Sequence, residues 1–440
     1  MSWLNHLIAG HGLAVWTIVV ALLANIPCAI VGCYLVLRRT SLMGDAISHS
    51  VLPGIVIAFV WSHRLESGPM FAGAIVMGLL AAVLTQSLNT FARVPEDSSM
   101  GVVFTSLFAL GVFLLSNLAR YVDLDPSCVL YGLIEAAPLD DTMNWFGLEV
   151  PLPVAPLVAA TLLAGVFVTV FWKELKISSF DPALSSAMGI NATLMHYLLM
   201  AMVAMVTVAA FEAVGSIIVI AMLIVPAATA HLLTDRFGRM MGLAILVAVA
   251  ASVLGYYGAV WIDTTVAGMI GVTAGGLFAS AVLFSPRHGV LGKAWNHLLL
   301  ALRIVGEDIV ALLYRAEELA GLSSRKTPGK LSLGRCVGAV GGGALAWLAA
   351  ARLLRRGEVQ VVGGELTLTP LGRRLAQSLV RSHRLWEAFL IEHFQLPLDH
   401  VHAPAERIEH YIGPQLQEIL AADLRAPDID PHGREIPKAE

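Results

Sequence analysis

Nine apolar stretches of membrane-spanning length, or close to it, follow one another through the first two thirds of the chain. They occupy roughly residues 13–37, 42–61, 70–91, 101–118, 154–172, 194–211, 214–233, 241–260 and 264–284. An apolar segment of about 18 or more residues with few charges is typical of a transmembrane helix. The two stretches that flank Glu212 are almost continuous, so eight spans with one broken or re-entrant helix is the alternative. The sequence therefore predicts an all-α polytopic membrane protein with eight or nine transmembrane helices.

The charged residues divide the chain into an apolar domain and a polar one. Hydrophobic residues make up 57% of the 440 residues and charged residues only 14%, which is too apolar for a soluble globular protein of this length. Most of the Lys and Arg residues lie after residue 285. We therefore expect a transmembrane domain over residues 1–292 and a polar domain over residues 293–440.

The basic residues that flank the apolar stretches predict the orientation of the chain. If there are nine spans, Arg64 and Arg120 fall on one side of the membrane and the other flanking basic residues fall on the opposite side. That larger group is Arg38, Arg39, Arg93, Lys173, Lys176, Arg236, Arg239, Arg287 and Lys293. Because cytoplasmic loops are enriched in Lys and Arg, the larger group marks the cytoplasm. We expect a multi-pass protein of the cell inner or plasma membrane, in contact with lipid, whose N-terminus is outside and whose polar domain is cytosolic.

The stretch Leu42–Ile57, LMGDAISHSVLPGIVI, places two ionisable side chains inside an apolar run. Asp45 and His49 are four residues apart, so both lie on one face of a helix. Ionisable side chains are costly in a membrane and usually face a bundle interior or a water-filled path. Pro53 and Gly54 follow and predict a kink or break. The pair is a candidate metal site; the alternative is that Asp45 and His49 pair only with each other or cap a helix.

A connecting segment between the fifth and sixth stretches is the second feature of interest. It reads SSFDPALSSAMGINA, residues 178–192. Pro182 directly after Asp181 predicts the first turn of a short amphipathic helix, and Gly189 predicts its end. On the predicted cytoplasmic side such a helix is a candidate docking surface; the alternative is an ordinary connecting helix.

The polar domain begins with the order of elements expected of a winged helix, at about residues 298–370. An amphipathic helix over residues 298–319 is followed by a helical stretch that ends at Arg356, before Gly357. The next residues alternate like a two-stranded hairpin that turns at Gly363 and Gly364, and another helix starts at Pro370. We expect mostly helical structure from there to the end of the chain.

Potential metal ligands are dense between residues 383 and 410. His383 and Glu387 are four residues apart, and Glu406, Glu409 and His410 have helical i, i+3, i+4 spacing, so each set projects from one face of a helix. A solvated charged helix would also carry carboxylates, but it would rarely carry so many His residues in register. The spacing favours a metal site.

Four separated motifs resemble those of the permease subunits of ABC-type importers for manganese, zinc or iron. They are LMGDAISHSVLPGI, DPALSSAMGI, FEAVGSIIVIAMLIVPAATAHLL and SPRHGVL, in the family's order, within roughly residues 10–292. The resemblance implies an all-α permease that works as a dimer with an identical or paralogous protomer, two cytosolic ABC ATPase subunits, and an external metal-binding protein. The chain has no GxxxxGKS or GxxxxGKT motif, so it is not expected to be an enzyme, and a separate subunit hydrolyses the ATP.

The same resemblance implies roles for two sets of residues. Asp45 and His49 correspond to the family's pair of metal ligands in the translocation pathway. The segment from Asp181 to Gly189 corresponds to its coupling helix, which contacts the ATPase. The residues assigned to this coupling role are Asp181, Pro182, Ala187, Met188 and Gly189.

The tail, from about Gly306 to Pro437, resembles the DtxR/MntR class of metal-responsive repressors. The segments HRLWEAFL and VHAPAERIEH carry the resemblance, which covers the winged helix and, over about residues 371–440, the metal-binding dimerisation helices. The implied ligand positions are Asp308, His383, Glu387, His402, Glu406, Glu409 and His410. Some relatives have a second carboxylate three residues after Asp308, where this chain has Ala311, so we expect the metal or its geometry to differ.

The segment that corresponds to the DNA-reading helix, VGAVGGGALAWLAAARLLRRG, has almost no polar side chain before Arg352. Reading base edges requires Arg, Lys, Asn or Gln on that helix face. Phosphate contacts are available from Arg355, Arg356, Arg373 and Arg374. We therefore do not expect sequence-specific DNA binding.

Together these features predict the membrane permease of an ATP-driven importer for a divalent transition metal, fused to a cytosolic metal-sensing domain. The metal is expected to be manganese first, then zinc or iron, because carboxylates mixed with imidazole suit Mn(II) or Fe(II) and no thiolate ligand is present to favour zinc. The same metal is the expected regulatory ligand. Two alternatives remain: a metal transporter driven by an ion gradient, and a membrane-tethered, metal-responsive DNA-binding regulator.

Overall fold

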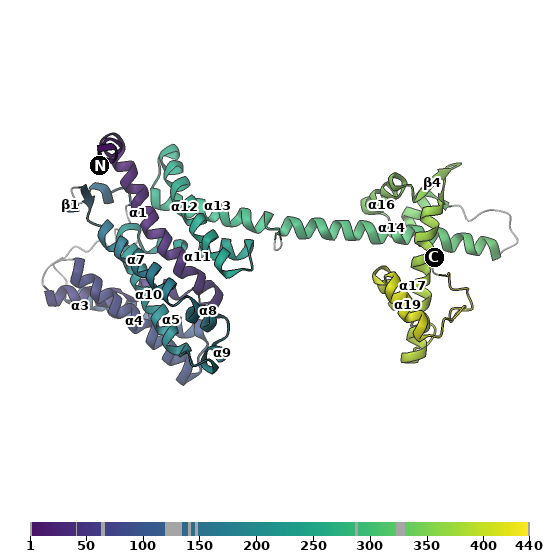
Figure 1. Ribbon diagram of the computed structural model, residues 1–440, viewed down its shortest axis with the longest axis horizontal. Coiled ribbons are helices and arrows are strands. Elements are labelled where there is room, and N and C mark those ends of the chain that lie inside the picture. Colours follow the sequence, from purple (N-terminus) through teal and green to yellow (C-terminus); the bar gives the residue numbers. More distant parts are fainter. Residues whose placement is uncertain are drawn as a thin grey trace. The chain divides into compact units, whose positions relative to one another are not determined.

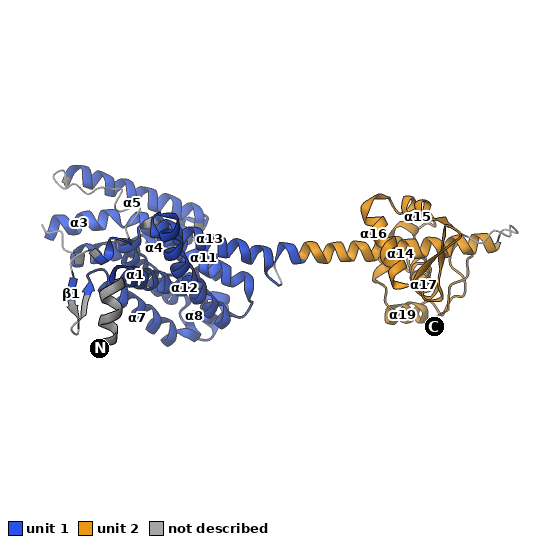
Figure 2. Cartoon of the chain, turned by 90° about the horizontal axis from the view of Figure 1, so that it is seen from above, with its two compact units in different colours: residues 1–292 blue, residues 293–440 orange. Residues whose placement is uncertain are grey.

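The computed structural model describes residues 2–40, 42–62, 67–118, 134–139, 142–145, 148–286, 289–322 and 331–438. The chain forms two compact units, unit 1 over Met1–Gly292 and unit 2 over Lys293–Glu440 (Figure 2). Three of the basic residues that orient the chain in the sequence, Arg64, Arg120 and Arg287, lie outside the described residues.

Unit 1 is a bundle of helices (Figure 1). Its helices are α1 (Ser2–Arg38), α2 (Met43–Ser50), α3 (Leu52–Ser62), α4 (Ser67–Ala92), α5 (Glu96–Leu118), α7 (Val154–Val170), α8 (Trp172–Phe180), α9 (Pro182–Ala187), α10 (Ala192–Val214), α11 (Ser216–Leu233), α12 (Phe237–Ile262) and α13 (Val266–Phe284). A short 3-10 helix, Ala137–Leu139, and a hairpin of β1 (Thr142–Trp145) and β2 (Leu148–Pro151) precede α7.

The nine apolar stretches of the sequence are all helical. Within the described residues, seven helices are long and apolar enough to cross a membrane, with α2 and α3 counted as one. The pair α7 and α8, bent by 75°, makes an eighth only if it is counted as one span. The apolar part of α11, Ile217–Leu233, is shorter. The prediction of an all-α polytopic membrane protein is confirmed.

Two breaks in unit 1 have local causes in the sequence. The stretches that flank Glu212 form two helices, because Gly215 between them has a φ of +83°, a conformation that glycine adopts at little cost. The break predicted near Pro53 lies at Val51, between α2 and α3. Pro53 is tolerated there because the first turn of a helix does not need its missing N–H group.

Small residues bring the helices of unit 1 close together. A Cβ atom on Gly54 would lie 2.2 Å from the carbonyl oxygen of Gly73 in α4, so only glycine allows this contact of α3 with α4. Close backbone approach of this kind is typical of helix packing in membranes. α1 packs against α7, α10, α11 and α12, and its side chains Ala24, Val31 and Tyr34 are fully buried.

Unit 2 contains most of the long helix α14 (Val290–Leu322) and a small three-stranded sheet. The remaining elements are β3 (Leu331–Ser332), α15 (Leu333–Ala339), α16 (Gly343–Arg356), β4 (Val359–Val362), β5 (Glu365–Leu368), α17 (Pro370–Phe394), α18 (His402–Ile408), the 3-10 helix η2 (Glu409–Tyr411) and α19 (Pro414–Asp423). The strands are antiparallel in the order β3-β5-β4. The hairpin turns at Gly363 and Gly364, as the sequence predicts. The helices predicted before the hairpin are present, but the second predicted stretch is divided into α15 and α16.

A hydrophobic core joins α14, α15, α16 and the hairpin, with Ile309, Leu313, Leu353 and Leu366 almost fully buried. A second, smaller core lies beside α17 and includes Leu385, Ile412 and Leu420. The two cores hold α14, α17 and η2 in fixed positions within unit 2. Most of the potential metal ligands lie on these three elements.

Candidate metal sites

Asp45 and His49 lie on one face of α2, as their spacing predicts. Nε2 of His49 is 3.2 Å from Oδ1 of Asp45, and both side chains are about one third exposed, at 33% and 34%. The imidazole lies beside Phe104 and Phe108 of α5, with ring centroids 6.0 Å away in both cases. No third His, Cys, Asp or Glu of the described chain joins this pair in a potential metal-ligand group. A complete metal site here needs further ligands from water, backbone or another protomer.

The segment that begins at Asp181 has the start and end that the sequence predicts. Oδ1 of Asp181 accepts a hydrogen bond of 2.9 Å from the backbone N–H of Leu184, which caps α9, and Pro182 occupies the first turn. Gly189 ends the turn after α9 with a φ of +81°. Leu184 and Met188 are large apolar side chains that are 51% and 59% exposed. The short capped helix and the residue that follows it thus expose two large apolar side chains.

The first group of potential ligands in unit 2 consists of His383, Glu387 and His402. His383 and Glu387 are buried on α17, and His402 begins α18. Nε2 of His383, Oε1 of Glu387 and Nδ1 of His402 form a triangle in which each pair of atoms is 3.0 Å apart.

The size of this triangle suits a metal ion. Two imidazole nitrogens can lie 3.0 Å apart only if at least one of them lacks a proton, since two N–H groups would repel each other. A metal ion about 2.1 Å from each of two ligands at right angles separates those ligands by about 3.0 Å. The three atoms are therefore spaced as neighbouring ligands of one octahedral ion.

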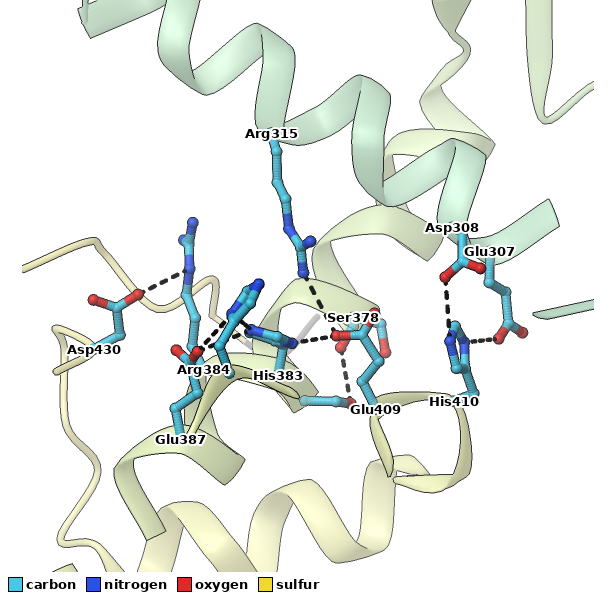
Figure 3. Close-up of polar contacts among 12 residues, drawn as sticks. Glu307, Asp308, Arg315, Ser378, His383, Arg384, Glu387, Glu409, His410 and Asp430 are labelled. Atoms are coloured by element: carbon cyan, nitrogen blue, oxygen red, sulfur yellow. Dashed lines mark hydrogen bonds and ion pairs between the residues drawn. The ribbon is translucent and has the colours of Figure 1, made fainter. Parts of the chain in front are cut away.

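The second group consists of Asp308, Glu409 and His410, from α14 and η2. Nε2 of His410 is 3.2 Å from Oδ1 of Asp308, and Nδ1 of His410 is 2.9 Å from Oε2 of Glu307 (Figure 3). Metal-ligating imidazoles usually donate their second ring N–H to a carboxylate, which fixes the orientation of the ring. Glu307 occupies that supporting position, which residue spacing within a single helix could not reveal.

The third group consists of Glu387, Asp430 and His432, with Nδ1 of His432 3.4 Å from Oε2 of Glu387. The sequence does not predict Asp430 and His432 as ligands; the available signal is their i, i+2 spacing in DPHG, far from the other ligands. Asp430 already accepts hydrogen bonds from the backbone N–H groups of His432 and Arg434, at 2.9 and 2.7 Å. Its second oxygen, Oδ2, pairs with Nε of Arg384 at 3.3 Å.

Glu406 is the implied ligand that the structure does not bring to any of these groups. It is exposed on α18, one turn after His402. Its assignment as a metal ligand stays a prediction.

The carboxylates around the two buried imidazoles change their protonation. Burial lowers the pKa of His410, but hydrogen bonds to Asp308 and Glu307 outweigh it and raise this pKa to about 9. Burial also lowers the pKa of His383, and the hydrogen bonds to Glu387 and Glu409 raise it overall. Burial raises the pKa of Glu387, whereas hydrogen bonds from His383 and His402 lower it to about 2. At neutral pH and without metal, the imidazole of His410 therefore holds a proton on both ring nitrogens and is positively charged.

The helix in the DNA-reading position, α16, exposes apolar side chains. Trp347 and Leu348 are 50% and 57% exposed. The basic residues expected to contact phosphate are Arg355 and Arg356, exposed at the end of α16, and Arg373 and Arg374 on α17. Arg373 is paired with Glu317 at 2.6 Å. Before Arg352, the exposed face of α16 lacks the polar side chains that base readout needs.

Comparison with known families finds two matches in this chain. The family described as the ABC 3 transport family matches residues 11–285. The family described as the iron dependent repressor, metal binding and dimerisation domain, matches residues 369–438. The second match includes most of the ligand groups of unit 2, but not Asp308.

Individual proteins match over unit 1 and beyond. The manganese transport system membrane protein MntD of Bacillus subtilis is 43% identical, over 63% of this chain and 94% of that protein. The zinc transport system membrane protein TroD of Treponema pallidum is 38% identical, over 82% of this chain and 97% of that protein. Among solved structures, PsaBC from Streptococcus pneumoniae in complex with Fab is 31% identical with a TM-score of 0.56, covering 65% of this chain and 97% of that chain.

Proposed function

Since the chain belongs to the ABC 3 transport family, we propose that it is the membrane permease of an ATP-driven importer that moves a divalent transition metal into the cytoplasm. The family match across residues 11–285 carries the proposal, because it spans the helices of unit 1 from α1 to α13. ATP hydrolysis is assigned to separate cytosolic ABC subunits. An external metal-binding protein delivers the ion, and a second permease protomer completes the membrane domain.

Manganese is the first choice of substrate, followed by zinc and iron. The B. subtilis relative is named for manganese transport and the T. pallidum relative for zinc transport. The three ligand groups of the described chain contain carboxylates and imidazoles and no cysteine. Such ligands suit Mn(II) or Fe(II) better than a metal that prefers thiolate ligands.

Asp45 and His49 are assigned to the ion in transit. They are the ionisable pair on α2, each about one third exposed, and they lie 3.2 Å apart. Two ligands from each of two protomers would provide four of the ligands that a divalent ion needs, without enclosing it so tightly that it cannot leave. Desolvating an ion in a membrane requires this kind of polar replacement for its water shell.

The segment from Asp181 to Gly189 is assigned to coupling with the ATPase. The capped α9 and the exposed Leu184 and Met188 support this role. In this arrangement a movement of the ATPase reaches the membrane helices through α8 and α10, which lie on either side of the segment in sequence.

Unit 2 is assigned the role of a sensor for the transported metal. Negative feedback requires a sensor in the compartment that receives the product, and the positive-inside orientation puts unit 2 in the cytosol. Its ligand groups draw on α14, α17, α18 and η2, so a bound ion holds separate elements together. Such binding regulates transport only if the metal prefers one conformation, and a tenfold effect needs about 1.4 kcal/mol of differential affinity.

The alternative of a membrane-tethered DNA-binding regulator has less support. The winged-helix elements are present, but before Arg352 the exposed face of α16 carries Trp347 and Leu348 and no polar base-reading side chain. A gel-shift of the protein with DNA from upstream of its own gene tests this alternative.

The metal dependence of ATP hydrolysis in the assembled complex tests the proposed function. We expect the external metal-binding protein loaded with manganese to stimulate hydrolysis more than the same protein loaded with zinc or iron. Hydrolysis that no divalent metal stimulates would count against a metal importer, and stimulation by zinc alone would correct the substrate.

A further inference from the structure

Arg38, the last residue of α1, makes three hydrogen bonds to two other helices. Its Nε and Nη2 donate to the hydroxyl oxygens of Ser179 and Ser178 on α8, each at 3.0 Å. Its Nη1 donates to Nδ1 of His196 on α10, also at 3.0 Å. Because a guanidinium can only donate, Nδ1 of His196 is the acceptor.

The partners of Arg38 lie on both sides of the coupling segment. Ser178 and Ser179 are near the end of α8, which stops at Phe180, directly before the capping residue Asp181. His196 lies in the first turns of α10, which follows the segment. A single guanidinium therefore holds the helix that enters the segment and the helix that leaves it.

The serine hydroxyls are oriented toward Arg38 by their own hydrogen bonds. Ser178 and Ser179 donate to the carbonyl oxygen of Leu175, at 3.2 and 2.6 Å, so their lone pairs remain available to the guanidinium. Ser178 is buried, at 3% exposure. Arg38 thus does more than place a positive charge at the C-terminus of α1, because its N–H groups donate hydrogen bonds to α8 and α10.

The other side of Arg38 leads to the proposed pathway. The backbone N–H of Thr40 donates to the carbonyl of Leu35, and that of Met43 donates to the carbonyl of Thr40, so the described residues Thr40 and Met43 mark a hydrogen-bonded turn between α1 and α2. α2 carries Asp45 and His49. Arg38 is the residue at which the ends of α1, α8 and α10 meet, next to this turn.

We infer that Arg38 is a positioning residue that fixes the coupling segment to the α1–α2 turn and so links ATPase movement to the helix that carries Asp45 and His49. This inference rests on the proposed function of the chain as an ABC permease. The planar guanidinium fork can engage three acceptors at fixed angles, which an ammonium group or an amide cannot do. The predicted consequence is a change in coupling, not in assembly.

The test uses the complete transporter in vesicles and measures manganese ions taken up per ATP hydrolysed. Arg38→Gln should lower this ratio by about tenfold or more, the factor expected when at least one of the three charge-assisted hydrogen bonds of Arg38 no longer distinguishes two states, while the ATPase subunits still co-purify. Arg39→Gln is the matched control: Arg39 is the next residue, is exposed, and carries the same charge. It should keep the wild-type ratio.

A second variant keeps the inference testable if Arg38→Gln does not assemble. Ser178→Ala with Ser179→Ala removes the acceptors on α8 and leaves Arg38 in place, and it should also lower the ratio. An unchanged ratio in an assembled Arg38→Gln complex, or in the serine variant, would overturn the inference and leave the proposed function standing. Wild-type vesicles that take up manganese without any need for ATP would overturn both.

Discussion

Glu409 accepts a hydrogen bond from Nδ1 of His383, and this contact connects two potential metal sites (Figure 3). His383 belongs to the group with Glu387 and His402, whereas Glu409 belongs to the group with Asp308 and His410. Oε2 of Glu409 also lies 3.5 Å from Nη2 of Arg315 on α14. A change in the charge of the Glu409 carboxylate therefore alters the electrostatic environment of both groups.

The first prediction concerns this shared carboxylate. Glu409→Gln keeps the size of the side chain but removes its charge, so it should weaken manganese binding by unit 2 about tenfold or more, as loss of a ligand or its support commonly does. Equilibrium dialysis of the purified full-length protein measures the affinity. Glu392→Gln, an exposed change on α17 outside the three groups, is the control. Equal manganese affinity in both variants would show that Glu409 does not contribute to the metal site.

The second prediction is a pH dependence of metal binding. A metal ligand must be deprotonated, and the hydrogen bonds of His410 to Asp308 and Glu307 raise its pKa to about 9. Below that pH, a proton on the ring nitrogen of His410 that would bind the metal competes with the metal. Above that pH, this nitrogen has no proton. Affinity should therefore rise by up to tenfold per pH unit between about 7 and 9 and then level off.

Calorimetry in buffers of different ionisation enthalpy measures the protons released in this reaction. We expect at least one proton to be released at neutral pH, and fewer above pH 9. His410→Ala should reduce the release. An affinity that stays constant over this range, with no proton release, would contradict the assignment of His410 as a ligand.

The third prediction concerns feedback. Deleting the chain after Gly292, or changing Glu409 and His410 to Ala together, should leave uptake intact and remove its inhibition by high cytosolic manganese. Vesicles loaded with manganese on the cytosolic side provide the measurement. If the wild-type protein shows no inhibition, or the variants keep all of it, unit 2 is not the sensor.

The fourth prediction concerns the coupling segment. Met188→Glu or Ala187→Glu puts a carboxylate on the exposed surface at the end of α9 and should release the ATPase subunits or separate ATP hydrolysis from uptake. Thr193→Glu, exposed five residues further on in α10, adds the same charge outside the segment and should have little effect. Co-purification and the uptake ratio decide between these outcomes, and unchanged values in both variants of the segment would show that it does not couple.

The sequence predicts well what depends on spacing within one helix. The nine apolar stretches are all helical, Asp45 contacts His49, and His383 contacts Glu387 across one turn of α17. Pro182 and Gly189 mark the ends of α9 correctly, because capping and turn chemistry are local.

The sequence does not predict the contacts between distant segments, because no local pattern of residues encodes them. Glu307 supports His410 from 103 residues away, and Arg38 reaches His196 from 158 residues away. Asp430 and His432 join Glu387 only because the chain after α19 returns to α17. Glu406, in contrast, has the spacing of a ligand but lies exposed outside the three groups.

The initial rate of manganese uptake by vesicles that contain the assembled transporter tests the central claim most directly. We predict uptake that requires both ATP and the ATPase subunits, and that falls to background in Asp45→Asn and in His49→Ala although both complexes assemble. Uptake that proceeds without ATP when an ion gradient is imposed, or that is unchanged in both variants, would contradict the account.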